Sequence, residues 1–235
     1  METPEKAKAR NDTKRHRTVT SGRILDQLRI DIMVGAYAPG TPLVEDDVAT
    51  EFGAARGSVR SALQTLRSEG LVEFLPNGRK LVAGFSPKQA IDMYELRLML
   101  ESRALEIAFQ TEKVFYTPLL MVIEEVEHFA AFPAEADWFD LDIRFHRALV
   151  RMSGNIPLAN AWEVNAPLMY ALMELNTTKG YRERYIEEFL ERHNTLVAPI
   201  ITRDRSSFDL LREHIIDASA ISSGVLEKLG TNRPA

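Results

Sequence analysis

The stretch at residues 42–74 constrains the fold of this chain more than any other part of the sequence. Within it, apolar residues recur at three- and four-residue spacings in two short segments, 43–52 and 56–68. Gly53 stands between the segments, and a glycine there permits a sharp turn because it has no Cβ atom. The pattern therefore predicts a short helix, a tight turn and a second helix.

A helix on one side and a hairpin on the other complete this pattern. Apolar positions from Ser21 onward repeat with helical spacing, and Gly35 ends that helix. Downstream, the runs LVEF and KLVAGF flank Pro76-Asn77-Gly78-Arg79, and Asn-Gly between two such runs is a strong hairpin signal. Helix, turn, helix and hairpin in this order predict a winged helix-turn-helix over residues 21–85, whose partner is double-stranded DNA.

The composition excludes several classes of protein. The 235 residues include no cysteine, which excludes disulfides and thiolate metal sites and fits a reducing cytoplasm. No apolar run approaches the roughly 20 residues that span a bilayer, so no membrane segment is expected. The net charge of −5 is unusual for a DNA-binding protein, but up to Gly84 the chain has 13 Lys and Arg against 11 Asp and Glu. The acidic excess therefore lies in the remainder.

Residues 1–20 are polar and include several basic side chains, so we expect a disordered basic tail there. Two interpretations fit that composition. The tail is either a solvated end without a role or a basic arm that adds contacts to DNA phosphates.

Residues 86–230 have helical patterns throughout. Ser86 and Pro87 open the first helix, since proline is favoured in a first turn. Further patterns follow between short breaks, and residues 158–176 read as one of these helices. We therefore expect a mainly α protein in which residues 86–230 form an all-α bundle of about six or seven helices.

The second helix of a helix-turn-helix lies in the major groove, with its first residues toward the base edges. Arg56 begins that helix and Arg60 lies one turn later, so both can contact guanine edges or phosphates. Ser58 between them suits a phosphate or base contact. In the predicted wing, Arg79 and Lys80 are placed to contact phosphate or the adjacent minor groove. The alternative is that these side chains are simply solvated.

The residues from Ser21 to Phe74 resemble the N-terminal domain of the GntR family of transcription regulators. In that family the second helix opens with Ser-Arg-Thr-Pro-Val-Arg before Ala-Leu, and this chain has Ala-Arg-Gly-Ser-Val-Arg at 55–60 and then Ala62-Leu63. Both arginines match. Ala55 lacks the side-chain oxygen that usually caps the helix, which typically costs about 1 kcal/mol, and Gly57 weakens the helix entry further.

Four residues in the helical part have the chemistry of a metal site. Asp142 and His146 are at i and i+4, so both project from one helix face and can share an ion. His193 and His214 follow on two later helices. One carboxylate and three imidazoles suit zinc, or else nickel, manganese or iron. Spacing alone leaves an alternative open, because separate histidines are more often hydrogen-bonded or exposed than bound to a metal.

The region from about Pro87 to Leu229 resembles the FCD domain, the effector-binding domain of the FadR-like subgroup of the same family. The family pattern is Arg-x-x-x-Glu, Asp-x-x-Phe-His, Ser-x-Asn and two separated histidines. This chain matches it with Arg97 and Glu101, Asp142, Phe145 and His146, Ser153 and Asn155, and His193 and His214. The resemblance implies that the aspartate and the three histidines hold a divalent transition metal.

A small carboxylate effector can occupy the positions that four protein ligands leave open on an octahedral ion. Arg97 is the candidate partner for its charge, although Arg97 can equally form a simple pair with Glu101 four residues later. Asn165 lies on a predicted helix that can line the same pocket.

These features predict a ligand-responsive transcription regulator, a repressor that binds a DNA operator as a homodimer and senses a small organic acid. Its effector must bind the DNA-competent and incompetent states unequally. No enzyme activity is expected, because the sequence has no protease metal motif, nucleophile elbow or phosphate loop. Two alternatives stay open: a metalloenzyme that uses the aspartate and three histidines, and a regulator in which these histidines are structural.

Overall fold

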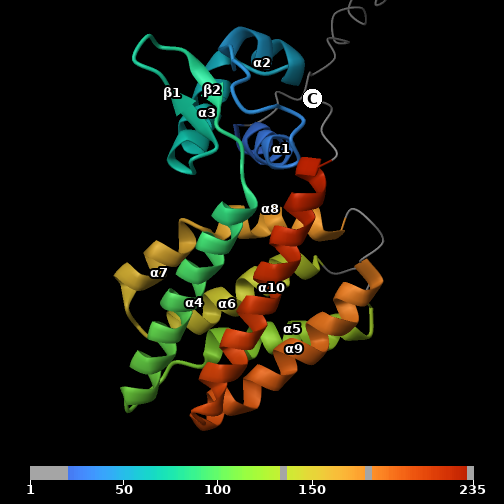
Figure 1. The fold of residues 1–235 in the computed structure, drawn as a ribbon. Helices are drawn as coiled ribbons and strands as arrows, with labels where there is room; N and C mark the ends of the chain where they lie inside the picture. The colour runs from blue at the N-terminus through green and yellow to red at the C-terminus, as the bar shows by residue number, and fades with distance from the viewer. Residues whose placement is uncertain (1–20, 133–136, 178–181, 232–235) are drawn as a thin grey trace, which may run out of the picture.

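The computed structural model describes residues 21–132, 137–177 and 182–231, so the predicted tail at 1–20 lies outside the described residues. The protein is mainly α, with one two-stranded sheet in the described part (Figure 1). Its elements in chain order are α1 (Ser21–Met33), α2 (Glu45–Phe52), α3 (Arg56–Ser68), β1 (Val72–Phe74), β2 (Lys80–Val82), α4 (Pro87–Gln110), α5 (Thr117–Ala130), α6 (Trp138–Arg151), α7 (Ile156–Glu163), α8 (Ala166–Thr177), α9 (Arg182–Thr202) and α10 (Ser206–Thr231). Within these ranges, none of the helices is long and apolar enough to cross a membrane.

Helices α1, α2 and α3 form the predicted helix-turn-helix core, which confirms the fold predicted for this part. α3 packs against both α1 and α2. Leu28 and Ile32 of α1 and Val59, Leu63 and Leu66 of α3 are fully buried, as expected when each helix turns one apolar face inward. Burying a side chain of this size stabilises the fold by roughly 1.5–3 kcal/mol.

The predicted wing is an antiparallel hairpin of β1 and β2, in which Phe74 lies opposite Lys80. Its turn contains the predicted Asn77-Gly78 pair, and Gly78 has a φ of 80°. One boundary differs from the prediction, because α2 begins later than the apolar pattern indicated. The Leu43 N–H donates to the Lys80 carbonyl oxygen (2.9 Å) and Val44 is extended, so this segment joins the wing before the helix starts.

A buried ion pair fixes α1 to the end of α3. Arg29 is 3% exposed and donates from Nε and Nη2 to the two carboxylate oxygens of Glu69, at 2.9 and 2.7 Å. Its Nη1 donates to Asp26 (2.8 Å). Burial lowers the pKa of Arg29, but the bonds to Glu69 and Asp26 outweigh burial and raise the pKa overall. The guanidinium therefore stays charged in the folded protein and depends on its partners.

Glu69→Gln is expected to lower the free energy of unfolding by roughly 3 kcal/mol, because it leaves a buried guanidinium without its bidentate partner. This value is at the low end of the cost of breaking a buried ion pair, because Asp26 still accepts a hydrogen bond from Arg29. Urea unfolding followed by circular dichroism measures it. Glu73→Gln, which changes an exposed acid on β1, is the matched control and should cost less than about 0.5 kcal/mol. Equal stabilities of the two variants would contradict the structural role of Glu69.

The helical bundle begins with a reciprocal cap. Ser86 Oγ accepts from the Gln89 N–H and the Gln89 side chain accepts from the Ser86 N–H, with Pro87 in the first turn as predicted. In the described ranges the bundle consists of seven helices, α4 to α10, which confirms the predicted all-α architecture. α10 packs along α4, and α6 contacts α4, α5, α7 and α8 (Figure 1). α6 therefore packs against four of the other helices of the bundle.

The single helix predicted at 158–176 is wrong. The structure has two helices there, α7 and α8, separated at Val164 and Asn165. Pro167 explains the break, because it has no N–H to donate and its ring would clash with the Glu163 carbonyl group in a continuous helix. The Asn165 carbonyl oxygen accepts the first backbone hydrogen bonds of α8 instead.

The two parts of the molecule meet where α1 contacts α8 (Figure 1). A cleft of about 440 Å³ lies at this contact, lined by Asp26 and Arg29 from α1 and by Tyr170 and Glu174 from α8, among others. The chain also connects the two parts directly, because α4 follows β2 after a short linker. The bundle and the helix-turn-helix are therefore connected in two places, by the α1–α8 contact and by the chain itself.

Candidate DNA interface and metal centre

The start of α2, the start of α3 and the wing line one groove of about 520 Å³. The side chains of Arg56 and Arg60 are 70% and 62% exposed, and Arg79 is exposed on the wing turn. The structure brings these three predicted residues together with Lys80 in the groove. Ser58 is half-buried in the first turn of α3 and is not one of the groove residues.

Two acids at the start of α2 form ion pairs with three of these cations, Arg56, Arg60 and Lys80. Glu45 accepts from Nε and Nη2 of Arg60, the shortest contact being 2.8 Å, and from Nζ of Lys80 at 3.1 Å. Asp46 forms an ion pair with Arg56. The bond from Arg60 is the main reason that the pKa of Glu45 falls to about 2, so this carboxylate is ionised at neutral pH. Sequence reasoning missed both acids, although an acidic run at the start of a predicted helix was the available signal.

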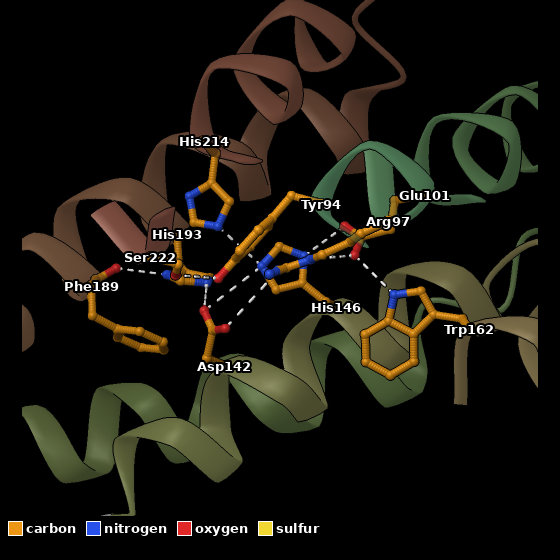
Figure 2. A network of polar contacts seen from close by, with 10 residues as sticks. All are labelled: Tyr94, Arg97, Glu101, Asp142, His146, Trp162, Phe189, His193, His214 and Ser222. Carbon is orange, nitrogen blue, oxygen red and sulfur yellow. Dashed lines mark hydrogen bonds and ion pairs between the residues drawn. The ribbon is translucent and has the colours of Figure 1, made fainter. Parts of the chain in front are cut away.

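The four predicted metal ligands converge inside the bundle. α6 supplies Asp142 and His146, α9 supplies His193 and α10 supplies His214 (Figure 2). One candidate ligand atom from each lies within 4.8 Å of all the others. Asp142, His146 and His193 are at most 4% exposed. The four side chains therefore share one buried centre instead of lying apart in the bundle.

Neighbouring acceptors orient two of the imidazoles. His193 Nδ1 lies 2.8 Å from the Phe189 carbonyl oxygen, and a carbonyl oxygen only accepts, so this nitrogen carries a proton. His146 Nδ1 likewise lies 2.7 Å from Glu101 Oε2. These Nδ1 protons leave each neutral ring with a lone pair on Nε2. His193 Nε2 lies 2.8 Å from Asp142 Oδ1, and a proton or a metal ion between these two atoms is what makes the contact attractive. The ring therefore faces the shared centre in the orientation that metal-bound histidines adopt.

The contact between His146 and His214 suits either a hydrogen bond or a shared ion. Their Nε2 atoms lie 3.0 Å apart, so the lone pair of one accepts an N–H from the other, or both lone pairs face one cation. Burial lowers the pKa of His146, and it lowers the pKa of His214 well below the usual value, so both rings are neutral near pH 7. Neutral imidazole is the form that binds metals.

Asp142 remains an anion in this buried position. Burial raises its pKa, but the contact with His193 and the positive charge of Arg97 are among the effects that outweigh burial and lower the pKa. One carboxylate and three imidazoles fit a divalent transition metal in charge and in ligand type. The residues present can therefore hold a metal ion.

Glu101 is a fully buried carboxylate behind the cluster and accepts three hydrogen bonds. Its Oε1 accepts from Arg97 Nε (2.8 Å) and Trp162 Nε1 (2.9 Å), and its Oε2 accepts from His146 Nδ1. Burial raises the pKa of Glu101, but His146 and Arg97 lower it overall. The sequence indicated the pair with Arg97, but not the contact with His146, which is 45 residues away.

Arg97 points into the same buried space (Figure 2). It is 1% exposed, and its Nη2 lies 4.0 Å from Asp142 Oδ2. Nη1 and Nη2 have no hydrogen-bond partner among the described residues. Tyr94 lies beside this guanidinium, and its hydroxyl shares a 3.0 Å hydrogen bond with Ser222 Oγ. Arg97 thus forms the pair with Glu101 through Nε while its two outer nitrogens remain open.

Asn165 lies in the turn between α7 and α8, not on a helix as predicted. Its Nδ2 donates to the Ala161 carbonyl oxygen at 2.9 Å. Among the contacts of the described residues, none joins it to the metal-ligand cluster. The structure therefore brings Arg97 to the cluster and gives Asn165 a local role in the turn.

Comparison with known proteins decides the family. Residues 20–82 match the family described as bacterial regulatory proteins, gntR family, and residues 92–217 match the FCD domain. The chain belongs to the GntR family of transcription regulators. The resemblances on which the sequence interpretation was based are confirmed over both parts of the chain.

Two curated relatives of this GntR-family protein are gluconate operon transcriptional repressors. The Bacillus subtilis protein is 30% identical, over 80% of this chain and 78% of its own length. The Bacillus licheniformis protein is 28% identical, over 80% and 79%. Among solved structures, a putative transcriptional regulator GntR from Rhodococcus sp. RHA1 has a TM-score of 0.61 at 20% identity, over 87% of this chain and 97% of that one. The protein is therefore a DNA-binding transcription regulator, and the relatives do not support the metalloenzyme alternative.

Proposed function

We propose that this regulator is a repressor that releases its operator when a small organic acid binds beside a metal ion in the FCD domain. Residues 21–85 form its DNA-binding unit and residues 86–230 its effector-binding unit. Two copies bind a pseudo-palindromic operator in the cytoplasm as a homodimer, because one helix-turn-helix reads one half-site. The names of the two gluconate operon repressors support repression as the direction of control.

On the DNA side, Arg56, Ser58 and Arg60 occupy the first turns of α3, where helix-turn-helix proteins contact base edges. Arg79 and Lys80 of the wing contact phosphate or the adjacent minor groove. The groove that the two α3 arginines share with the wing supports this assignment.

The observation that carries the effector proposal is the buried Arg97 beside the aspartate and three histidines. A buried guanidinium with two open nitrogens is costly unless an anion pairs with it, and a carboxylate accepts two parallel bonds from such a group. Zinc, or else nickel, manganese or iron, held by the four ligands supplies a Lewis-acidic centre for the same carboxylate. Arg97 neutralises the acid and fixes its orientation. Asn165 is not part of this proposal, because its amide is bonded to Ala161.

α4 provides the connection from this site to the DNA. It carries Arg97 and Glu101, and it begins at Pro87, shortly after the wing. A ligand that draws Arg97 toward the cluster shifts α4 and so changes the position of the wing base. The shifted α4 belongs to a dimer geometry that does not fit two half-sites. The acid favours this geometry because it binds it more tightly than the DNA-competent one.

A thermal-shift screen of small carboxylates, each with and without zinc, nickel or manganese, tests this function. Gluconate heads the set because of the names of the relatives. We expect one class of acid to raise the unfolding temperature only when metal is present. At 100 times its Kd, such an acid should raise the free energy of unfolding by about 2.7 kcal/mol. The same acid should release the protein from a duplex that it selects from a random-sequence library. Equal stabilisation with and without metal would contradict the proposed site.

A further inference from the structure

We propose that Glu45 is a specificity-determining, positioning residue of the DNA-reading surface, which orients Arg60 and joins the wing to the recognition helix. This rests on the proposed base reading by Arg60. The role of Glu45 also goes beyond that base reading, because a carboxylate in a DNA-contacting groove repels phosphate and needs a compensating role. The contacts of Glu45 supply that role.

Glu45 lies between α3 and the wing, with only 16% of its side-chain surface exposed. Three contacts of 2.8–3.2 Å join its oxygens to Nε and Nη2 of Arg60. A carboxylate against this side of a guanidinium fixes the plane of the group. These contacts leave Nη1 and the outer N–H of Nη2 for a second partner, and two parallel N–H groups match O6 and N7 of guanine.

The same carboxylate holds Lys80, which comes from the wing. Lys80 Nζ lies 3.1 Å from Glu45 Oε1 and 5.2 Å from the ring centroid of Phe74. The Lys80 side chain is 19% exposed, so its ammonium group has a fixed position at the groove. An isolated two-stranded hairpin is marginally stable. One acid therefore sets where the wing stands relative to the first turns of α3.

Helix-end stabilisation does not by itself explain Glu45. Acidic residues are favourable in the first turn of any helix, but Asp46 and Asp47 occupy the same turn of α2 and are more exposed. Among the ion pairs of the described residues, none joins Asp47 to a groove cation, so Asp47 is the natural comparison. What distinguishes Glu45 is that two cations from different elements converge on it.

The test uses the full-length protein and two duplexes. The first is the best binder that the wild type selects from a random-sequence library, and the second has the same bases in shuffled order. The readout is the ratio of the two affinities. For Glu45→Gln we expect the shuffled duplex to bind more tightly, because a negative charge leaves the groove, while the ratio falls at least about tenfold through the lost arginine contact. Glu45→Asp retains the charge but is shorter, so the ratio should fall without tighter binding to the shuffled duplex.

Asp47→Asn is the matched control, since it removes one negative charge from the same turn and should change both affinities together. Arg60→Ala separates the inference from the proposed base reading. An unchanged ratio for Arg60→Ala overturns both. A lower ratio for Arg60→Ala with unchanged ratios for both Glu45 variants overturns the positioning role alone. Thermal unfolding verifies that each variant is folded, and Glu45→Asp keeps the test decisive if Glu45→Gln unfolds.

Discussion

His214→Ala is expected to abolish stoichiometric metal binding while the bundle stays folded. Of the four proposed ligands, His214 has the fewest structural contacts to lose, because it is half-buried and its Nδ1 has no hydrogen-bond partner among the described residues. Mutation of a residue that hydrogen-bonds to a metal ligand weakens metal binding roughly 10–100-fold. Removal of a ligand itself should weaken binding by more than that. The variant retains only three of the four proposed ligands, and His146 loses the nitrogen that lies 3.0 Å from its own Nε2.

Metal content after purification without a histidine tag measures this effect. The wild type should retain roughly one equivalent per chain against dialysis, and the variant less than about a tenth. His128→Ala is the matched control, because His128 is exposed on α5 and outside the cluster. Added metal should stabilise the wild type and the control but not His214→Ala. A variant that binds metal as well as the control would contradict the ligand assignment.

A helix was predictable from the sequence where its own apolar residues, at helical spacing, form the face that it buries. α3 has the predicted bounds of 56–68, since both its apolar spacing and its ends were visible in the sequence. The break between α7 and α8 was missed, although Pro167 signalled it, because the apolar residues keep helical spacing across the turn. Local patterns therefore predicted the elements better than they predicted the joints between them.

The contacts that define the two candidate sites could not be derived from spacing. Only Asp142 and His146 share a helix, so the cluster exists because α6, α9 and α10 pack around one centre. Glu101 contacts His146 across 45 residues, and Glu45 contacts Arg60 across 15. Both acids look like ordinary helix residues in the sequence. Their roles depend on which helices become neighbours, and this is settled by packing rather than by local pattern.

Glu101→Gln is expected to weaken metal binding by about 100-fold, at the upper end for a residue behind a ligand. Two donors, Arg97 and Trp162, approach Oε1, so the amide oxygen of glutamine takes that position. The amide NH₂ then occupies the place of Oε2 and faces His146 Nδ1, 2.7 Å away in the wild type. An NH₂ group only donates, so His146 must accept at Nδ1 and carry its proton on Nε2. That proton points at the metal centre and blocks the ligand atom.

Chelator competition at neutral pH measures the affinity of Glu101→Gln for zinc, and Glu106→Gln, an exposed acid on the same helix, is the control. Glu101→Gln also leaves Arg97 without its ionised partner, so the free energy of unfolding of the variant should be lower by roughly 3–5 kcal/mol. Trp162→Phe separates the two effects: it removes one donor from Oε1 but keeps the carboxylate, so the tautomer of His146 and the zinc affinity should both persist. If folded Glu101→Gln bound zinc as tightly as the wild type, Nδ1 protonation would not be what prepares His146. In that case Glu101 would serve only as the buried counter-ion of Arg97.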